Sequence, residues 1–496
     1  MQPIFTRLKF IAGLMPADQI AIQDDSEAIT YKELFRRIEQ CSQWIRSREV
    51  RCLGLYADNS IDWVIADLAC QEVGITCIPL PMFFSEEQLR RCIHGSGIDF
   101  ILGKDPEIMP SSTAGVAEGT KLQVIRIKKA GQGITPKGTQ KVTFTSGSTG
   151  APKGVCLSLD HQWEVAESLA DRLNINRPRH LCLLPLSTLL ENIAGIYSPL
   201  LSGGTVLVPG DFQRGFSGSS SLDINKLLGC ISSNRPNSII LIPQLLGILI
   251  QAASNGWMPP DSLKFIAVGG GKVSTDLIIR ARRLGLPVYQ GYGLSECGSV
   301  VALNTPQRDR KDSVGKILPH CKVSIDPDGE IKVAGAIFLG YLDSPETWYP
   351  KEVKTGDLGD VENSFLQVKG RKKNILITSF GRNISPEWVE SEILSNLAVQ
   401  QCMVVGDGRP YLTALISADK NFSNQQLERW IQNVNARLPD YARVQQWERI
   451  ESSDFLGFLT ENGRLKRSQI EHGFSRQIDR LYPNVTQYSN QRMVLP

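Results

Sequence analysis

The residues best suited to chemistry lie in one short stretch, 143–154, which reads TFTSGSTGAPKG. Three glycines, five hydroxyl side chains and Lys153 occur there, after a short expected strand. Glycines let backbone N–H groups turn toward an anion, hydroxyls add donors, and the lysine adds positive charge. The composition therefore predicts a polyphosphate cradle. It argues against a flexible Gly/Ser linker, because linkers rarely set Pro-Lys-Gly between two apolar segments.

This stretch is not a Walker A loop. Pro152 stands where the second Walker glycine belongs, and Gly154 where the magnesium-binding Ser or Thr should follow the lysine. The stretch instead resembles the signature loop of the adenylate-forming superfamily, which includes acyl- and aryl-CoA synthetases, adenylation domains of peptide synthetases and firefly luciferase. The resemblance implies that Lys153 is catalytic. It also implies nucleotide binding by Thr145, Ser146, Gly147, Ser148, Thr149, Gly150 and Lys153.

Two further motifs, 268–272 (VGGGK) and 292–296 (YGLSE), are similar to the adenine site of that family. There a small-residue strand end and a tyrosine ring sandwich the base. The resemblance implies nucleotide binding by Gly269, Gly270, Gly271, Tyr292 and Gly293. It also implies that Ser295 meets the α-phosphate and that Glu296 is a catalytic residue and the magnesium ligand. One carboxylate suits Mg²⁺, which takes few protein ligands and fills its shell with phosphate and water.

Residues 355–357 (TGD) resemble the ribose clamp of the family, with Asp357 accepting both sugar hydroxyls. Residues 370–373 (GRKK) resemble its domain boundary, where Arg371 would contact the ribose-phosphate end and Lys373 would lie at the hinge. Each of these short motifs alone is typical of an ordinary turn. Their order over about residues 29–470 makes the resemblance specific. Residues 184–191 (LPLSTLLE) and 405–415 are most similar to the long-chain fatty acyl-CoA synthetases and acyl-AMP ligases.

The resemblance implies a reaction in two steps. A carboxylic acid attacks the α-phosphate of ATP bound with Mg²⁺, which gives acyl-AMP and pyrophosphate. A thiol, from coenzyme A or from the phosphopantetheine of an acyl carrier protein, then displaces AMP. Positioning and cations supply most of the rate enhancement in such phosphate chemistry. The small domain is expected to reorient about Lys373 between the steps.

One position departs from the family at the C-terminal catalytic loop. Residues 459–467 (LTENGRLKR) match that loop, and Arg464 stands in the place of its catalytic lysine. Arginine keeps the charge, but its planar fork differs from a compact ammonium. Three possibilities stay open: Arg464 performs the role, Lys466 replaces it, or adenylation is weak. The first is preferred.

Two substrate positions also depart from the family. Thr188 replaces a histidine at the mouth of the acyl pocket, and Phe380 replaces a glycine beside the pantetheine tunnel, next to Gly381. A ring there would narrow the approach of the thiol, so coenzyme A and a carrier protein both remain candidate acceptors. Apolar residues near the family's pocket segments favour an aliphatic acid, although each also suits a plain core position. They are Trp163, Leu189, Leu190, Pro243, Leu245 and Leu246.

The elements that must hold these residues alternate between helix and strand in the first two thirds of the chain. Thr30 and Glu33 form a capping-box pattern, and Gly74 ends a helix that begins near Ser60. Continuous apolar strands between helices predict largely parallel sheets covered on both faces. These strands are expected at 75–80, 100–102, 180–184, 205–208, 238–242 and 265–268.

After about residue 315, apolar and polar residues alternate along the chain. Residues 322–325, 330–333 and 365–368 predict an antiparallel meander, with a turn at 326–329. The expected fold class is α/β: a large N-terminal domain of parallel-rich sheets sandwiched by helices, with a β-meander or barrel part. A small mobile α+β domain follows it. The expected domains are 1–371, the AMP-binding core, and 372–496.

Composition narrows the function classes. The chain has 496 residues, with 54 Lys and Arg against 51 Asp and Glu, which gives no charge-based reason for nucleic-acid or membrane-surface binding. The eleven cysteines form no C-x-x-C pair and the five histidines show no metal spacing, so reduced core thiols are expected. The longest apolar run, 238–250, is broken by Pro243, and no secretory segment opens the chain. These features predict a cytoplasmic protein without a transmembrane segment.

The leading hypothesis is an AMP-forming acid–thiol ligase. It would activate a medium- or long-chain carboxylic acid with ATP and Mg²⁺ and transfer the acyl group to coenzyme A. The first alternative is an acyl-AMP ligase that loads a carrier protein. The second is a nucleotide-binding pseudoenzyme with weak adenylation, which Arg464 and Phe380 motivate.

Overall fold

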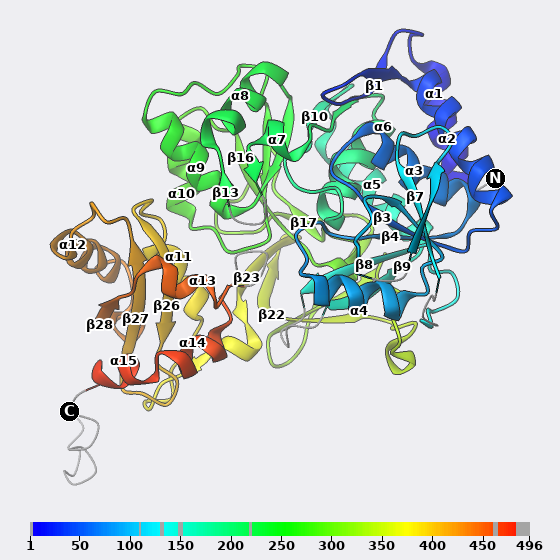
Figure 1. Ribbon diagram of the computed structural model, residues 1–496. Coiled ribbons are helices and arrows are strands. Elements are labelled where there is room, and N and C mark those ends of the chain that lie inside the picture. Colours follow the sequence, from blue (N-terminus) through cyan, green and yellow to red (C-terminus); the bar gives the residue numbers. More distant parts are fainter. Residues whose placement is uncertain are drawn as a thin grey trace, which may run out of the picture. The chain divides into compact units, whose positions relative to one another are not determined.

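The computed structural model describes residues 3–108, 111–128, 133–146, 152–217, 221–459 and 465–482 (Figure 1). The chain forms two compact units. The first comprises residues 1–271, 278–355 and 360–367, and the second comprises 272–277, 356–359 and 368–496. The domain boundary expected between residues 371 and 372 stays a prediction.

One sheet of the first unit has eight strands, in the order β21–β9–β8–β4–β3–β5–β7–β6. Their bounds are β3 Cys52–Tyr56, β4 Thr76–Pro79, β5 Phe100–Gly103, β6 Ser111–Val116, β7 Gln123–Ile127, β8 Lys141–Ser146, β9 Pro152–Leu157 and β21 Gly340–Tyr341. Strands β5, β3, β4 and β8 are parallel, and antiparallel strands extend both edges. The predicted parallel centre is therefore present, with an antiparallel hairpin, β8–β9, beside it.

The other large sheet has thirteen strands, in the order β19–β20–β22–β23–β18–β17–β16–β15–β14–β10–β11–β1–β2. The strands from β16 to β1 in this order are parallel. Their bounds are β1 Ile20–Gln23, β10 Arg179–Leu181, β11 Thr205–Leu207, β14 Ser238–Leu241, β15 Phe265–Val268 and β16 Val288–Tyr292. The predicted strands of the middle third are thus confirmed, although β10 ends three residues early because the chain leaves the sheet before Pro185.

The alternating segments after residue 315 form antiparallel strands, as predicted. These are β18 Lys316–Ile317, β19 Cys321–Ile325, β20 Glu330–Gly335, β22 Val353–Glu362 and β23 Phe365–Arg371. Two further strands of the sheet lie earlier in the chain, β17 Ala302–Leu303 and β2 Ala28–Thr30. In the β19–β20 hairpin Val323 pairs with Val333. Gly329, at φ +83°, closes its turn, a conformation that favours glycine.

Helices flank these sheets. Their bounds are α1 Pro3–Leu14, α2 Tyr31–Ser47, α3 Ile61–Val73, α4 Glu86–Ser96, α5 Leu159–Leu173, α6 Ser198–Leu201, α7 Asp211–Arg214, α8 Ile224–Asn234, α9 Pro243–Ser254 and α10 Thr275–Arg283. The Thr30 hydroxyl accepts the Glu33 N–H at 3.3 Å, which supplies one half of the predicted capping box. Gly74, at φ +85°, ends α3 where the sequence placed its end. A π-helix, η1 Glu191–Tyr197, leads directly into α6.

The second unit is built around a three-stranded sheet, β26 Val399–Val405, β27 Leu412–Ala418 and β28 Val444–Arg449 (Figure 1). Its helices are α11 Pro386–Ile393, α12 Asn424–Asn435, α13 Ser452–Leu456, α14 Arg467–Gly473 and α15 Ser475–Arg480. Buried residues such as Val389, Ile416 and Ile431 form one core cluster, and Met403, Phe455 and Ile470 belong to a second. The predicted α+β character of this region is confirmed.

All eleven cysteines are buried and free, as the sequence predicted. Burial raises the pKa of the Cys156 thiol to about 12, and similar shifts hold other thiols in their neutral form. Within the residues that the structure describes, no helix is both long enough and apolar enough to cross a membrane.

Candidate active site

Four parallel strands of the larger sheet end along one edge. β10 ends at Leu181, β14 at Leu241, β15 at Val268 and β16 at Tyr292. Ligands of open α/β sheets bind outside the carboxyl ends of such strands. The segments predicted to bind nucleotide or acid begin at or just beyond these ends, at 184–188, 243–246, 269–271 and 292–296. The topology therefore gathers segments from four separate parts of the first unit.

Glycines line the ends of two neighbouring strands. Val268 pairs with Gln290, so the next residues, Gly269 and Gly291, lie side by side. A Cβ built on Gly269 would lie 3.6 Å from the carbonyl oxygen of Gly291. Gly270 has φ +82°, and both Gly270 and Gly271 are exposed. Backbone without side chains thus lies beside the end of β16, whose last residue is the half-buried Tyr292.

Glu296 is held by a short turn after β16. The 3-10 turn η2 spans Ser295–Cys297, and the N–H of Phe338 donates to the backbone oxygen of Glu296 at 2.7 Å. Gly293 has no room for a side chain, because a Cβ there would lie 1.9 Å from the Ser299 oxygen. Tyr292, Ser295 and Glu296 are all half-buried, so each keeps part of its side chain accessible.

Lys153 lies at the start of β9, where a hairpin returns from β8. Thr145 pairs with Lys153 and Ser146 with Pro152, so the predicted phosphate loop connects two paired strands. Gly147, Ser148, Thr149 and Gly150 lie outside the described residues, as does the side chain of Ser146. Gly154 has a packing role, because a Cβ there would lie 2.9 Å from Cβ of Leu342. The Lys153 side chain is exposed.

Tyr341 joins Lys153 to Glu296. The Nζ atom of Lys153 lies 5.3 Å from the centroid of the Tyr341 ring, and the Tyr341 hydroxyl donates to Oε1 of Glu296 at 2.8 Å. Burial, reinforced by the Glu296 charge, raises the pKa of Tyr341 well above its usual value, so the hydroxyl stays a donor. Two predicted residues, Lys153 in β9 and Glu296 in the turn after β16, thus contact one ring. Sequence reasoning missed Tyr341 because the strand β21 has two residues, too few for any periodic signal.

Asp357 and Arg371, the predicted ribose contacts, form an ion pair in the second unit. Nε of Arg371 lies 2.8 Å from Oδ1 of Asp357, across the neighbouring strands β22 and β23. The Asp357 side chain is nearly buried, whereas that of Arg371 is partly exposed. The pair presents a carboxylate acceptor and a guanidinium donor at one point, which suits a sugar-phosphate contact.

The residues predicted for the hinge and the thiol tunnel are exposed. Lys373 lies in the 3-10 turn η4, Lys372–Asn374. Phe380 exposes 64% of its surface and precedes Gly381, which has φ +73°. The Gly381 N–H donates to the Thr378 oxygen at 2.8 Å and closes this turn. The ring of Phe380 therefore contributes little to the core of its own unit, and its role toward a thiol stays a prediction.

The C-terminal loop is described on either side of Arg464, which itself lies outside the described residues. Leu459 pairs with Leu465, and the N–H of Lys466 donates to the Phe458 oxygen at 2.7 Å. Residues 460–464 therefore connect two paired positions. Lys466 is half-buried at the start of α14. The hydrogen bond to the Phe458 oxygen fixes the backbone of Lys466.

The residue after Lys466 anchors the loop. Nη1 of Arg467 lies 2.5 Å from Oε1 of Glu390, and that oxygen also accepts the Val404 N–H at 2.8 Å. Both side chains are largely buried. Burial raises the pKa of Glu390, and the charge of Arg467 opposes that shift. Sequence reasoning missed this pair because the two residues are far apart in the chain and belong to no common motif.

The predicted acid-binding residues have mixed environments. Thr188 is half-buried in the loop before η1, and its N–H donates to the Pro185 oxygen at 2.9 Å. Trp163 is fully buried and stacks on Tyr197, with ring centroids 4.8 Å apart. Leu189, Leu245 and Leu246 are also buried, whereas Leu190 and Pro243 are half-buried. A core role therefore explains four of the six apolar positions without any ligand.

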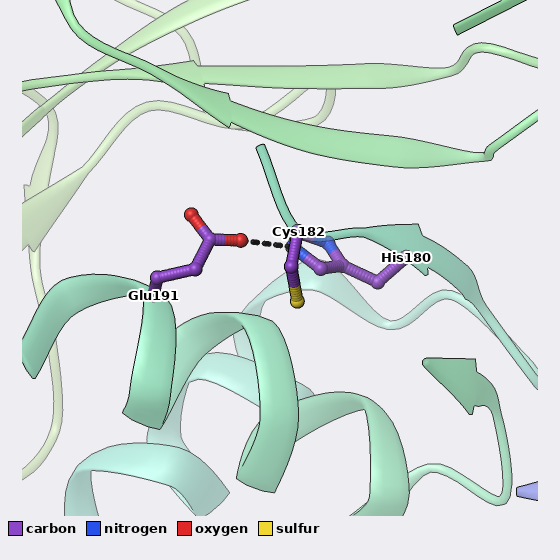
Figure 2. Close-up of side chains that lie close together, drawn as sticks. All are labelled: His180, Cys182 and Glu191. Carbon is purple, nitrogen blue, oxygen red and sulfur yellow. Dashed lines mark hydrogen bonds and ion pairs between the residues drawn. The ribbon is translucent and has the colours of Figure 1, made fainter. Parts of the chain in front are cut away.

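A buried polar cluster lies beside this segment. Potential ligand atoms of His180, Cys182 and Glu191 are all within 4.8 Å of one another (Figure 2). Sequence spacing missed this group because it combines a strand with a π-helix. His180 already has two partners: Nδ1 lies 2.9 Å from Oγ of Ser238 and Nε2 lies 3.2 Å from Oε1 of Glu191. We therefore interpret it as a hydrogen-bonded core cluster.

Comparison with known proteins matches both parts of the chain. A family model described as AMP-binding enzyme matches residues 12–342, and one described as AMP-binding enzyme C-terminal domain matches residues 373–486. The 2-succinylbenzoate–CoA ligase of Bacillus subtilis is 26% identical over 422 residues, covering 80% of this chain and 83% of that protein. The long-chain-fatty-acid–CoA ligase FadD15 of Mycobacterium bovis is 25% identical over 514 residues, covering 85% of this chain and 84% of that protein.

Solved structures share the fold. The O-succinylbenzoate coenzyme A synthetase of Bacillus subtilis, in complex with ATP and magnesium ion, has a TM-score of 0.73 and 25% identity, covering 94% of this chain and 99% of that one. The anthranilate CoA ligase AuaEII, in complex with anthranoyl-AMP, has a TM-score of 0.77 and 16% identity, covering 94% and 96%. At that identity the second likeness concerns the fold alone.

Proposed function

Because this chain belongs to the AMP-binding enzymes, we propose that it joins a carboxylic acid to a thiol through an acyl-adenylate. In the first step a carboxylate oxygen bonds to the α-phosphorus of ATP, and the bond to pyrophosphate breaks. In the second step a thiolate sulfur bonds to the acyl carbon, and AMP leaves. The protein's own residues position these groups and balance their charge.

The observation that carries the proposal is the convergence of Lys153, Tyr341 and Glu296 in the first unit. The exposed ammonium of Lys153 lies over the Tyr341 ring, and the half-buried carboxylate of Glu296 accepts from its hydroxyl. Lys153 would bind the β- and γ-phosphates of ATP. Glu296 would hold Mg²⁺, and a single carboxylate fits that ion because Mg²⁺ keeps several waters and takes phosphate oxygens as ligands. When bound there, Mg²⁺ would supply positive charge that offsets the negative charge of the phosphates.

The glycine-lined strand ends support the nucleotide part of the proposal. Gly269, Gly270 and Gly271 lie beside Tyr292 and would hold the adenine, and Ser295 would donate to the α-phosphate. In the second unit Asp357 would accept the ribose hydroxyls, with Arg371 beside it. These assignments are supported by the matching motifs, by the proximity of Gly269 to Gly291 and by the Asp357–Arg371 ion pair.

We propose an acid with an apolar body, either a medium- or long-chain fatty acid or a substituted benzoate. The relatives include ligases named for each class. Leu190 and Pro243, the two predicted apolar positions that are only half-buried, lie in segments that follow the strand ends and favour an apolar body. Coenzyme A is the proposed acceptor, because the relatives are named as CoA ligases. The exposed ring of Phe380 keeps a carrier protein as the alternative acceptor.

A pyrophosphate-release screen tests this proposal. The purified protein is given MgATP with fatty acids, 2-succinylbenzoate, other aryl acids and amino acids, each with coenzyme A or with holo-carrier protein. We expect release with an apolar acid, together with a thioester of coenzyme A. If a thioester forms only on the carrier protein, the acceptor is the carrier protein and not coenzyme A. ATP binding without acid-dependent release for any acid would contradict the ligase and favour a pseudoenzyme.

A further inference from the structure

We propose that Tyr341 is a positioning residue of the nucleotide site, which holds Glu296 in place for Mg²⁺ and keeps Lys153 apart from it. This inference rests on the proposed function, since it deepens the roles given there to Lys153 and Glu296. Neither the sequence motifs nor the comparisons assign a role to Tyr341. The argument depends on where this ring lies and on how firmly it is held.

The backbone of Tyr341 is fixed from three sides. It pairs with Val155 of β9, two residues from Lys153, so β21 and the phosphate hairpin share a register. Its N–H donates to Oγ1 of Thr347 at 2.9 Å, and its carbonyl oxygen accepts Nε1–H of Trp348 at 2.9 Å. A displacement of the Tyr341 backbone would therefore require breaking several hydrogen bonds.

The preceding glycine makes this placement possible. Gly340 has φ +131°, and a Cβ there would lie 2.6 Å from Cδ1 of Trp348. Only glycine fits so close an approach at that backbone conformation. The ring of Phe338 packs edge-on against that of Tyr341, with centroids 4.9 Å apart. Both the backbone and the ring of Tyr341 are thus preorganised.

Tyr341 contacts two opposite charges. Its hydroxyl donates to Oε1 of Glu296, while the Lys153 ammonium lies 5.3 Å from its centroid. Within the described part of the chain, no ion pair joins Lys153 directly to Glu296. A direct pair would occupy the carboxylate that Mg²⁺ needs and the ammonium that phosphate needs. Tyr341 satisfies both charges with weaker contacts, a hydrogen bond and a cation–π interaction, which incoming MgATP can replace.

Two substitutions separate the two contacts. Tyr341→Phe removes the hydroxyl and keeps the ring, whereas Tyr341→Leu removes both. Tyr349→Phe is the matched control, because Tyr349 is exposed and its hydroxyl donates to the Lys137 oxygen, outside the proposed site. Rates of pyrophosphate release are measured against Mg²⁺, ATP and acid. Thermal stability is recorded for every variant.

We expect Tyr341→Phe to raise the Mg²⁺ concentration for half-maximal rate roughly three- to tenfold, since a hydrogen bond to a charged group is lost. The KM for the acid should not change. Tyr341→Leu should raise the KM for ATP as well, and Tyr349→Phe should match the wild type. An unchanged Mg²⁺ dependence in Tyr341→Phe would overturn the proposal. So would an equal loss of rate at all Mg²⁺ concentrations, which indicates a merely structural role.

A binding measurement keeps this test independent of the ligase reaction. The rise in thermal stability caused by ATP is measured over a series of Mg²⁺ concentrations, with no acid present. If the wild type binds MgATP but releases no pyrophosphate, the proposed ligase activity fails. The Tyr341 proposal then stands if Tyr341→Phe needs more Mg²⁺ than the wild type for the same stabilisation. It falls if the two curves coincide.

Discussion

His320 shows how a single buried side chain makes stability depend on pH. Its Nε2–H donates to the Val300 oxygen at 2.9 Å, and its Nδ1 is buried without a hydrogen-bond partner among the described residues. Burial lowers the pKa of His320 to about 4, because the charged form would lose its hydration. The unfolded chain would titrate near the usual histidine value of about 6.5. Between these two pH values the unfolded state binds more protons than the folded state.

The stabilisation from neutral His320 is therefore complete above about pH 6.5 and is lost as the pH falls toward 4. We expect urea unfolding of the wild type to show a free energy of unfolding that decreases through this window. In His320→Gln the decrease should be smaller, by an amount on the order of 3 kcal/mol at the acid end. The same pH dependence in both proteins would show that His320 is not responsible.

Arg464 and Lys466 are the two candidates for the cation that serves the first half-reaction, and substitutions distinguish them. We expect Arg464→Ala to slow acid-dependent pyrophosphate release roughly a hundredfold, the usual cost of losing a preorganised donor. Arg464→Lys should keep most of the rate, and Lys466→Ala should have little effect. If pyrophosphate release is slow in Lys466→Ala and normal in Arg464→Ala, Lys466 and not Arg464 performs the role. Unchanged rates in all three variants would remove this loop from the mechanism.

At the scale of elements, the Arg467–Glu390 pair fixes α14 against α11 and β26. Removing one partner of a buried pair leaves an uncompensated charge, so Arg467→Ala should lower the free energy of unfolding of the second unit by about 3–5 kcal/mol. The double substitution of Arg467 and Glu390 by Met should cost less. Arg480→Ala, which breaks the exposed pair with Glu448, is the control and should cost under about 1 kcal/mol. Equal losses in Arg467→Ala and Arg480→Ala would contradict the anchoring role.

Continuous apolar strands and helices with clear end signals were the parts that the sequence predicted well. Apolar runs such as those of β14 and β15 identified parallel strands, and Ser60 and Gly74 marked the ends of α3. Short or irregular elements were missed for a physical reason. The two-residue strand β21 and the π-helix η1 carry no period of their own and form only because surrounding segments hold them. Tyr341 and Glu191 lie in these two elements, so their contacts could not be predicted from spacing.

At the scale of the whole molecule, the two units have separate cores. Ile101 is buried in a core of the first unit and Ile431 in a core of the second. We expect calorimetry to show two thermal transitions. Truncation to Ala at either position should cost about 2–5 kcal/mol in its own unit. Ile431→Ala should lower only one transition and Ile101→Ala only the other. A single transition that both variants lower equally would contradict independent cores.

Acid-dependent exchange of pyrophosphate into ATP is the most direct test that Lys153 and Glu296 serve one nucleotide site. The account predicts exchange in the wild type and a loss of roughly a hundredfold or more in both Lys153→Ala and Glu296→Gln. Lys322→Ala, which removes an exposed lysine of β19, should retain the wild-type rate. Wild-type exchange in Lys153→Ala and Glu296→Gln, with both proteins folded, would contradict the account.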